Sequence, residues 1–147
     1  WYTIVAMELI QEIPMEEGLK RHFLTVYENQ VEALKRYADP ETGLWHTVID
    51  DPDSYLELSA SAAFLRGIMQ GVRLGILKRK AYEGLIEKAV KGLLDNIDDD
   101  GTVKNVSYGT PIGLDKEFYN KIPCCPMTYG QALMILALQE ALTDYWH

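Results

Sequence analysis

The chain has 147 residues, of which 48% are hydrophobic and 24% charged, and its formal net charge at pH 7 is −8. This composition is typical of one globular domain, and it excludes a disordered tail, a collagen-like repeat and, with two Cys, a disulfide scaffold. No stretch reaches the roughly 20 apolar residues that a membrane span requires. Nucleic acids and anionic membranes bind to a basic face of a protein, whereas this chain is acidic overall. We therefore expect neither a nucleic-acid partner nor a membrane partner.

The first residue is Trp1, and residues 1–13 have the periodicity of a helix from their first turn. No Ser, Thr, Asp or Asn precedes this segment to cap it, so we expect that the chain has been cut from a longer one. Pro14 ends the segment. The lack of a secretory pattern favours the cytoplasm, but a cut start would also remove a leader, so the compartment is not indicated.

Two amphipathic helices with charged outer faces are predicted over residues 16–38 and 78–96. Between them, a helix is expected over residues 54–75, because Ser54 and Glu57 have the Ser-x-x-Glu spacing of a capping box. This middle helix is rich in Ser, Ala and Gly. Small residues either let helix backbones approach closely or leave room for a bound ligand.

Two irregular segments separate the helices. Residues 39–53 begin with a turn cluster and are expected to form an ordered loop with room for a short strand. Residues 98–121 are longer, with short strands expected around residues 102–106, and a loop of this length in a compact domain is often functional. A last helix over residues 127–145 is apolar nearly all round, so we expect it to be buried.

Helices rich in small and apolar residues thus alternate with charged amphipathic helices along the chain. A toroid or solenoid of α-hairpins requires this alternation, because each unit covers its apolar face only by stacking on its neighbours. We therefore predict an all-α fold in which residues 1–147 form a single domain. Functional loops would lie at one end of the inner helices.

The residues that flank the buried helices combine aromatic rings with hydroxyl, imidazole and carboxylate groups. They are Trp45, His46, Tyr55, Glu57, Ser59, Tyr108, Thr110, Tyr119 and Tyr129. A cleft of this composition suits a carbohydrate, because flat rings contact the C–H face of a sugar and polar groups bind its hydroxyls. The alternative is that the rings are half-buried packing residues, that Glu57 is a helix cap and that His46 is a hydrogen-bonded, partly buried side chain.

The sequence contains no motif for a metal ion or a cofactor. The acidic residues 98–100, followed by Gly101, lack the later ligands of a calcium loop and are expected to form a solvated turn. The adjacent Cys124 and Cys125 lack metal-ligand spacing, and we expect two buried or half-buried free thiols. We therefore expect that the chain uses neither a metal ion nor a cofactor.

Three segments carry a resemblance to a known family. Residues 43–62, GLWHTVIDDPDSYLELSASA, match a long run that begins G-L-W and continues through S-Y-x-E-x-S. Residues 106–111 match a V-x-x-G-T loop with a later Tyr, here Tyr119, and residues 129–140 match a final helix, with Gln131 where Gly is usual. Together these segments resemble the unsaturated rhamnogalacturonyl hydrolases of glycoside hydrolase family 105, in which Trp1 would close an R-G-N-G-W motif.

This resemblance implies an (α/α)6 toroid of helical hairpins, of which the chain would be the C-terminal part, about half, with about five main helices. It also implies removal of a 4,5-unsaturated galacturonyl residue from pectin (rhamnogalacturonan) oligosaccharides by hydration of the vinyl ether, in which an Asp protonates C4 and activates the water that adds at C5. That Asp belongs to the N-terminal half of the family, so we expect no catalytic residue here and no activity of the isolated chain. The positions that match the substrate cleft, or the motifs beside it, are Trp1, Trp45, His46, Tyr55, Glu57, Ser59, Gly109 and Thr110.

Three hypotheses remain open at this point: part of a hydrolase, a stand-alone carbohydrate-binding module and a purely structural helical module. The expected ligand is an unsaturated galacturonyl oligosaccharide in the first two. Part of a toroid also leaves its first and last hairpins without the neighbours that cover them. We therefore expect self-association through the exposed terminal helices.

Overall fold

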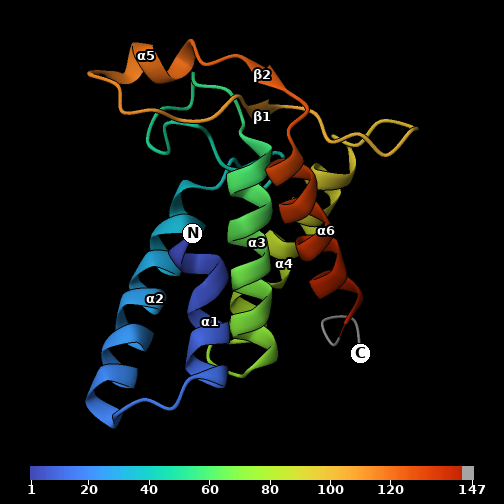
Figure 1. The fold of residues 1–147 in the computed structure, drawn as a ribbon. Helices are drawn as coiled ribbons and strands as arrows, with labels where there is room; N and C mark the ends of the chain where they lie inside the picture. Colours follow the sequence, from blue (N-terminus) through green and yellow to red (C-terminus); the bar gives the residue numbers. More distant parts are fainter. Residues whose placement is uncertain (144–147) are drawn as a thin grey trace.

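The computed structural model describes residues 1–143, which are helical apart from connecting loops and one small two-stranded sheet (Figure 1). The helices are α1 (Tyr2–Glu12), α2 (Glu17–Tyr37), α3 (Leu58–Arg73), α4 (Arg79–Leu94), α5 (Lys116–Asn120) and α6 (Thr128–Leu142). Strands β1 (Val106–Ser107) and β2 (Cys124–Cys125) pair antiparallel, with Val106 opposite Cys125. The all-α prediction with about five main helices is confirmed, and none of the helices described is long and apolar enough to cross a membrane.

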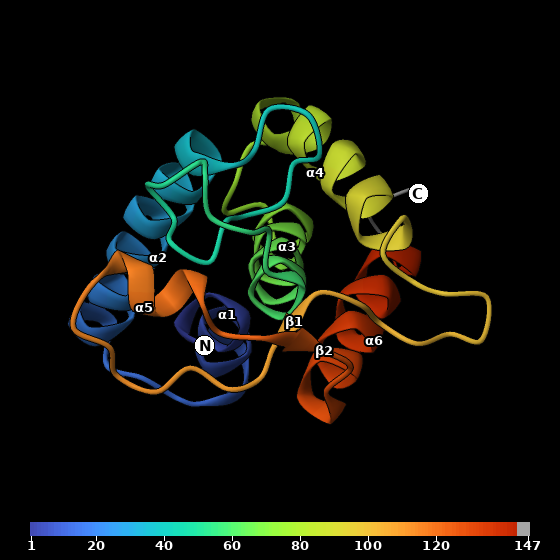
Figure 2. The ribbon, with the colours of Figure 1, turned by 90° about the horizontal axis from the view of Figure 1, so that it is seen from above.

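The long helices form two rows. Helices α1, α3 and α6 lie side by side in an inner row, while α2 and α4 lie outside them (Figure 2). The three inner helices run in one direction and the two outer helices return in the other (Figure 1). Both long loops and the small sheet therefore gather beyond the N-terminal ends of the inner helices, and the predicted alternation of inner and outer helices is confirmed.

Glycines in α3 allow its neighbours to approach closely. A Cβ atom added to Gly67 would lie 2.2 Å from the carbonyl oxygen of Thr3 in α1, and one added to Gly71 would lie 2.1 Å from the hydroxyl of Tyr27 in α2. That buried hydroxyl donates a hydrogen bond of 2.6 Å to the Gly67 carbonyl. Because an Ala at either position would collide with a neighbouring helix, these small residues serve helix packing.

Helix α3 begins four residues later than the capping-box prediction placed it. An isolated bridge between His46 and Leu56 holds the preceding chain extended, and Glu57 is the N-cap. The Ser54 hydroxyl instead donates to the Asp51 carbonyl at 2.8 Å, within the loop. The prediction was wrong about Ser54 because the loop offers this hydroxyl a partner of its own.

Two other predictions were wrong about burial. Helix α6 is not buried all round, since Ile135 is 57% and Leu142 81% exposed on the side that faces away from α3 and α4. Cys124 is an exposed free thiol, and Cys125 is half-buried as expected. The long loop also contains the short helix α5, which the sequence pattern did not indicate and which Asp115 caps through the backbone N–H of Phe118.

Candidate functional site

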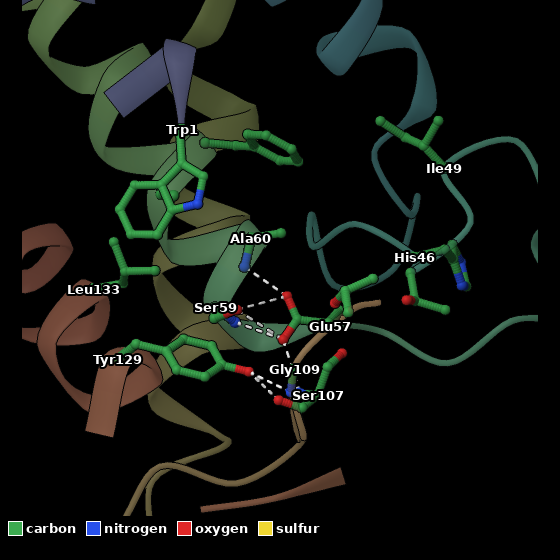
Figure 3. A pocket seen from close by; sticks show the side chains of 14 residues that line it. Trp1, His46, Ile49, Glu57, Ser59, Ala60, Ser107, Gly109, Tyr129 and Leu133 are labelled. Atoms are coloured by element: carbon green, nitrogen blue, oxygen red, sulfur yellow. Dashed lines mark hydrogen bonds between the residues drawn. The ribbon is translucent and has the colours of Figure 1, made fainter. Parts of the chain in front are cut away.

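A pocket of about 490 Å³ opens at the loop end of the inner helices. Its walls come from the starts of α1, α3 and α6, from the loop before α3 and from the loop that contains β1 (Figure 3). The lining residues are Trp1, His46, Thr47, Ile49, Glu57, Ser59, Ala60, Ala63, Phe64, Ser107, Gly109, Thr110, Tyr129 and Leu133. This volume lies within the usual range for small-molecule sites, and six of the eight predicted site residues line the pocket.

Glu57 lies at the base of the pocket with its side chain fully engaged, as Figure 3 shows. Its carboxylate accepts hydrogen bonds from the backbone N–H groups of Ser59 and Ala60 at 3.2 and 2.6 Å, which caps α3. It also accepts from the Ser59 hydroxyl at 2.9 Å and from the Ser107 N–H at 3.1 Å. Glu57 is 5% exposed, so this carboxylate caps a helix and ties α3 to β1 at the same time.

His46 lies on the opposite wall, in the loop before α3. Its Nδ1 lies 2.5 Å from the Ser54 carbonyl oxygen, and this contact requires a proton on Nδ1 because a carbonyl can only accept. Its Nε2 lies 3.9 Å from the carboxylate of Asp39. The ring is therefore oriented by two groups, and the expectation of a hydrogen-bonded, partly buried histidine is confirmed.

Asp39 supports His46 from outside the pocket lining. Its carboxylate accepts hydrogen bonds from the backbone N–H and the hydroxyl of Thr42 at 2.7 and 2.6 Å, and from the backbone N–H of Glu41 at 3.2 Å. Partial burial raises the pKa of Asp39, but these hydrogen bonds and the nearby His46 lower it by more, so the net shift is downward. Asp39 is thus a stable anion that faces the His46 ring.

Two predicted site residues do not line the pocket. Trp45 is fully buried: its indole N–H donates to the Leu34 carbonyl at 2.8 Å, and its ring packs edge-on against Phe64. The prediction that Trp45 offers a surface to a sugar was therefore wrong. The Tyr55 hydroxyl pairs with the hydroxyl of Ser107 at 2.8 Å, so this ring contacts the pocket wall from behind.

The rings in the pocket come from Trp1, Phe64 and Tyr129 (Figure 3). Trp1 lies at the rim and is 79% exposed. Phe64 was not among the predicted site residues, and neither were Ala60, Ala63 and Leu133. These four belong to α3 and α6 and have the pattern of core residues, so nothing in the sequence separates them from the buried face.

The described residues offer no cluster of three or more side chains that could hold a metal ion. The acidic turn after α4 is solvated as expected, and its Asp98 pairs with the Lys104 ammonium at 2.8 Å. Among the lining residues that the structure describes, Glu57 is the only carboxylate, and there is no Lys or Arg. The pocket is therefore lined by residues with aromatic rings, hydroxyls and one imidazole, a set suited to binding a polyhydroxylated ring.

Comparison with known proteins places this geometry in a family. Residues 1–145 match the family model described as Glycosyl Hydrolase Family 88. The chain is 34% identical over 141 residues to the unsaturated rhamnogalacturonyl hydrolase YesR of Bacillus subtilis, covering 93% of this chain and 39% of that protein. It is 26% identical to an unsaturated 3S-rhamnoglycuronyl hydrolase of Alteromonas sp., covering 97% of this chain and 33% of that protein.

Solved structures agree with the sequence relatives. A possible member of family GH105 from Salmonella enterica serovar Paratyphi A superposes with a TM-score of 0.91 at 40% identity, over 99% of this chain and 38% of that one. The expected fold, part of an (α/α)6 toroid, is confirmed. The part of the toroid that this chain forms is smaller than the predicted half, since the chain spans less than two fifths of the length of these relatives. The chain thus belongs to Glycosyl Hydrolase Family 88, and its resemblance to the unsaturated rhamnogalacturonyl hydrolases is confirmed.

Proposed function

We propose that this chain supplies one side of the sugar cleft of a hydrolase that removes 4,5-unsaturated galacturonyl residues from rhamnogalacturonan oligosaccharides. The observation that carries the proposal is the pocket itself: three aromatic rings, the His46 imidazole and the loop of Gly109 and Thr110 converge at one end of the inner helices. The relative named as an unsaturated rhamnogalacturonyl hydrolase supports the substrate class.

In the proposed reaction, an acid protonates C4 of the vinyl ether and water adds at C5, after which the hemiketal opens and releases the next sugar. This step needs a carboxyl group that can give and take a proton within hydrogen-bond reach of the substrate. Glu57 is the only carboxylate among the described lining residues, and its oxygens already accept from four donors. We propose that the chain by itself binds the sugar without turning it over.

We propose that His46, on the loop before α3, contacts the bound sugar. The Ser54 carbonyl oxygen, 2.5 Å from its Nδ1, and the Asp39 carboxylate, 3.9 Å from its Nε2, fix the orientation of this ring at the pocket wall.

Calorimetry with the unsaturated galacturonyl-rhamnose disaccharide tests this proposal. We expect a dissociation constant on the order of millimolar, because only one side of the cleft is present, and weaker binding by His46→Ala. The saturated disaccharide serves as the ligand control. The loss of the ultraviolet absorbance of the C4–C5 double bond reports turnover. Robust turnover by the 147-residue chain would contradict the proposal that it is inactive alone, and absence of heat would favour a purely structural module.

We also propose self-association through the terminal helices. Trp1 before α1 and Ile135 and Leu142 on α6 are exposed apolar side chains at the two edges of the inner row. Covering them removes apolar surface from water, which favours association. Light scattering at micromolar concentration should give a mass above that of the monomer, and Ile135→Asp should reduce it. A sharp monomer mass for the unmodified chain would refute this proposal.

A further inference from the structure

The loop of residues 107–110 forms one wall of the pocket but has little packing of its own. Ser107 is buried in β1, whereas Tyr108, Gly109 and Thr110 are all exposed. A Cβ atom added to Gly109 would meet no atom within 4 Å, so open space surrounds this turn. The shape of the wall must therefore come from hydrogen bonds at its base, because close packing does not hold it.

Ser107 lies at the base of this loop, and its N–H, hydroxyl and carbonyl groups all form hydrogen bonds. Its N–H donates to the Glu57 carboxylate at 3.1 Å, and its hydroxyl pairs with the Tyr55 hydroxyl at 2.8 Å. Its carbonyl accepts from the Tyr129 hydroxyl and from the Gly109 N–H at 2.9 Å. Three side chains from two segments of the sequence thus fix one residue at the start of the loop.

Tyr129 contacts both ends of the turn. Its hydroxyl donates to the Ser107 carbonyl and accepts from the Gly109 N–H at 3.2 Å, as the dashed lines in Figure 3 show. Gly109 adopts a φ of 70°, in the left-handed region that glycine tolerates best. The hydroxyl therefore stabilises a tight turn by bridging residues that lie two apart.

The next residue explains how Tyr129 reaches this position. A Cβ atom on Gly130 would lie 2.5 Å from Cγ2 of Val106, so only glycine lets the first turn of α6 pack directly on β1. This close approach brings the Tyr129 ring beside the pocket and its hydroxyl under the loop. Tyr129 therefore supplies the hydrogen bonds to the loop, and Gly130 supplies the space that lets α6 lie close enough to form them.

We propose that Tyr129 is a positioning residue that holds residues 107–110 in the shape that presents Gly109 and Thr110 to the sugar. This inference rests on the proposed carbohydrate site, but it concerns how the wall is held and assigns no proton transfer to Tyr129. A loop held in its binding shape loses less conformational freedom when the ligand arrives, which strengthens binding.

The experiment compares Tyr129→Phe with Tyr37→Phe in the 147-residue chain. Both changes remove one hydroxyl and keep the ring, but Tyr37, at the end of α2, is 41% exposed and lies outside the pocket lining and the loop. Amide hydrogen exchange at Gly109 should become about tenfold faster in Tyr129→Phe, since two hydrogen bonds of ordinary strength are lost, and should stay unchanged in Tyr37→Phe. The melting temperature of Tyr129→Phe should fall by only a few degrees and that of Tyr37→Phe should stay unchanged, because a tenfold change in opening corresponds to about 1.4 kcal/mol.

Disaccharide affinity gives the second readout. It should fall about tenfold in Tyr129→Phe and stay unchanged in Tyr37→Phe. Unchanged exchange at Gly109 in Tyr129→Phe would overturn the inference, and so would faster exchange spread evenly over the whole chain. If the unmodified chain binds no disaccharide, the proposed function fails, but the exchange comparison still decides whether Tyr129 holds the loop.

Discussion

The two loop walls of the pocket are held by different forces. The wall before α3 rests on the core: Trp45 is fully buried, its backbone N–H donates to the Ser61 hydroxyl at 2.9 Å, and the next residue, His46, forms a bridge with Leu56. The wall after β1 leaves the core at Ser107 and depends on side-chain hydrogen bonds. We therefore expect the first wall to open only when the whole domain unfolds, and the second to open locally.

Trp45→Ala should have the largest effect. Removing this buried ring leaves a cavity under the first wall and an unpaired carbonyl at Leu34, which should cost about 3–5 kcal/mol in the free energy of unfolding. Urea denaturation followed by circular dichroism measures the loss. Trp1→Ala, at an exposed rim position, should change stability by less than about 0.5 kcal/mol. Equal effects of the two changes would mean that the first wall does not rest on the core.

Glu57→Gln acts on both walls, because Glu57 caps α3 and also accepts from Ser107. An amide NH₂ cannot accept from a backbone N–H, so one side of the cap is lost and a buried donor is left unpaired. We expect a loss of about 2 kcal/mol. Glu83→Gln, on the exposed face of the outer helix α4, is the matched control and should be close to neutral. A neutral Glu57→Gln would contradict the structural role of this carboxylate.

Gly109→Ala tests the second wall alone. An Ala at a φ of 70° is strained by about 1 kcal/mol, although its methyl group would meet no neighbour. Hydrogen exchange should therefore rise at residues 107–110 and remain unchanged in α3. Gly84→Ala in α4, where a methyl group also has open space, should instead stabilise the chain by about 0.5 kcal/mol. Destabilisation by both changes would contradict the prediction, because it would mean that the added methyl group, and not the backbone conformation of Gly109, causes the loss.

Asp39→Asn should have the smallest effect, about 0.5 kcal/mol at neutral pH, because Asn keeps part of the turn but loses the charge that faces His46. The pKa of Asp39 is lower in the folded chain than its ordinary value of 3.8, because hydrogen bonds from Thr42 and Glu41 and the nearby His46 outweigh its partial burial. Its contribution to stability is therefore complete above that value and is lost as the pH falls through the folded pKa. Unfolding in urea over a pH series should show the two proteins converging in acid. A difference that does not change with pH would contradict the role of the charge.

Local patterns in the sequence predicted most of the helices correctly. The apolar periodicity of residues 16–38 and 78–96 corresponds to α2 and α4, and the small residues of α3 mark where α1 and α2 approach it. These features depend on neighbours within one or two helical turns, or on the volume of one side chain, so they can be inferred without the fold. Helix α5 could not, because its five residues are too few to show a period.

The candidate site was predicted less completely, and the errors have one cause. Trp45 and His46 are adjacent in one motif, yet the first is fully buried in the core and the second lines the pocket. Phe64 and Leu133 have the pattern of core residues and belong to or pack on the core, but they also line the pocket. Whether a side chain faces the core or the pocket depends on which helix or loop packs against it. A sequence motif does not contain that information.

The sequence by itself determined the helical class, the alternation of inner and outer helices and the family, because periodicity and motifs are properties of the chain. Only the tertiary structure decided which motif residues surround the pocket and which support it. In the folded chain, Glu57 caps α3 and also binds β1. Tyr129 lies under a loop whose Ser107 is 22 residues away in the sequence. Contacts between distant segments form only when the helices pack, so their partners are decided by packing and not by sequence spacing.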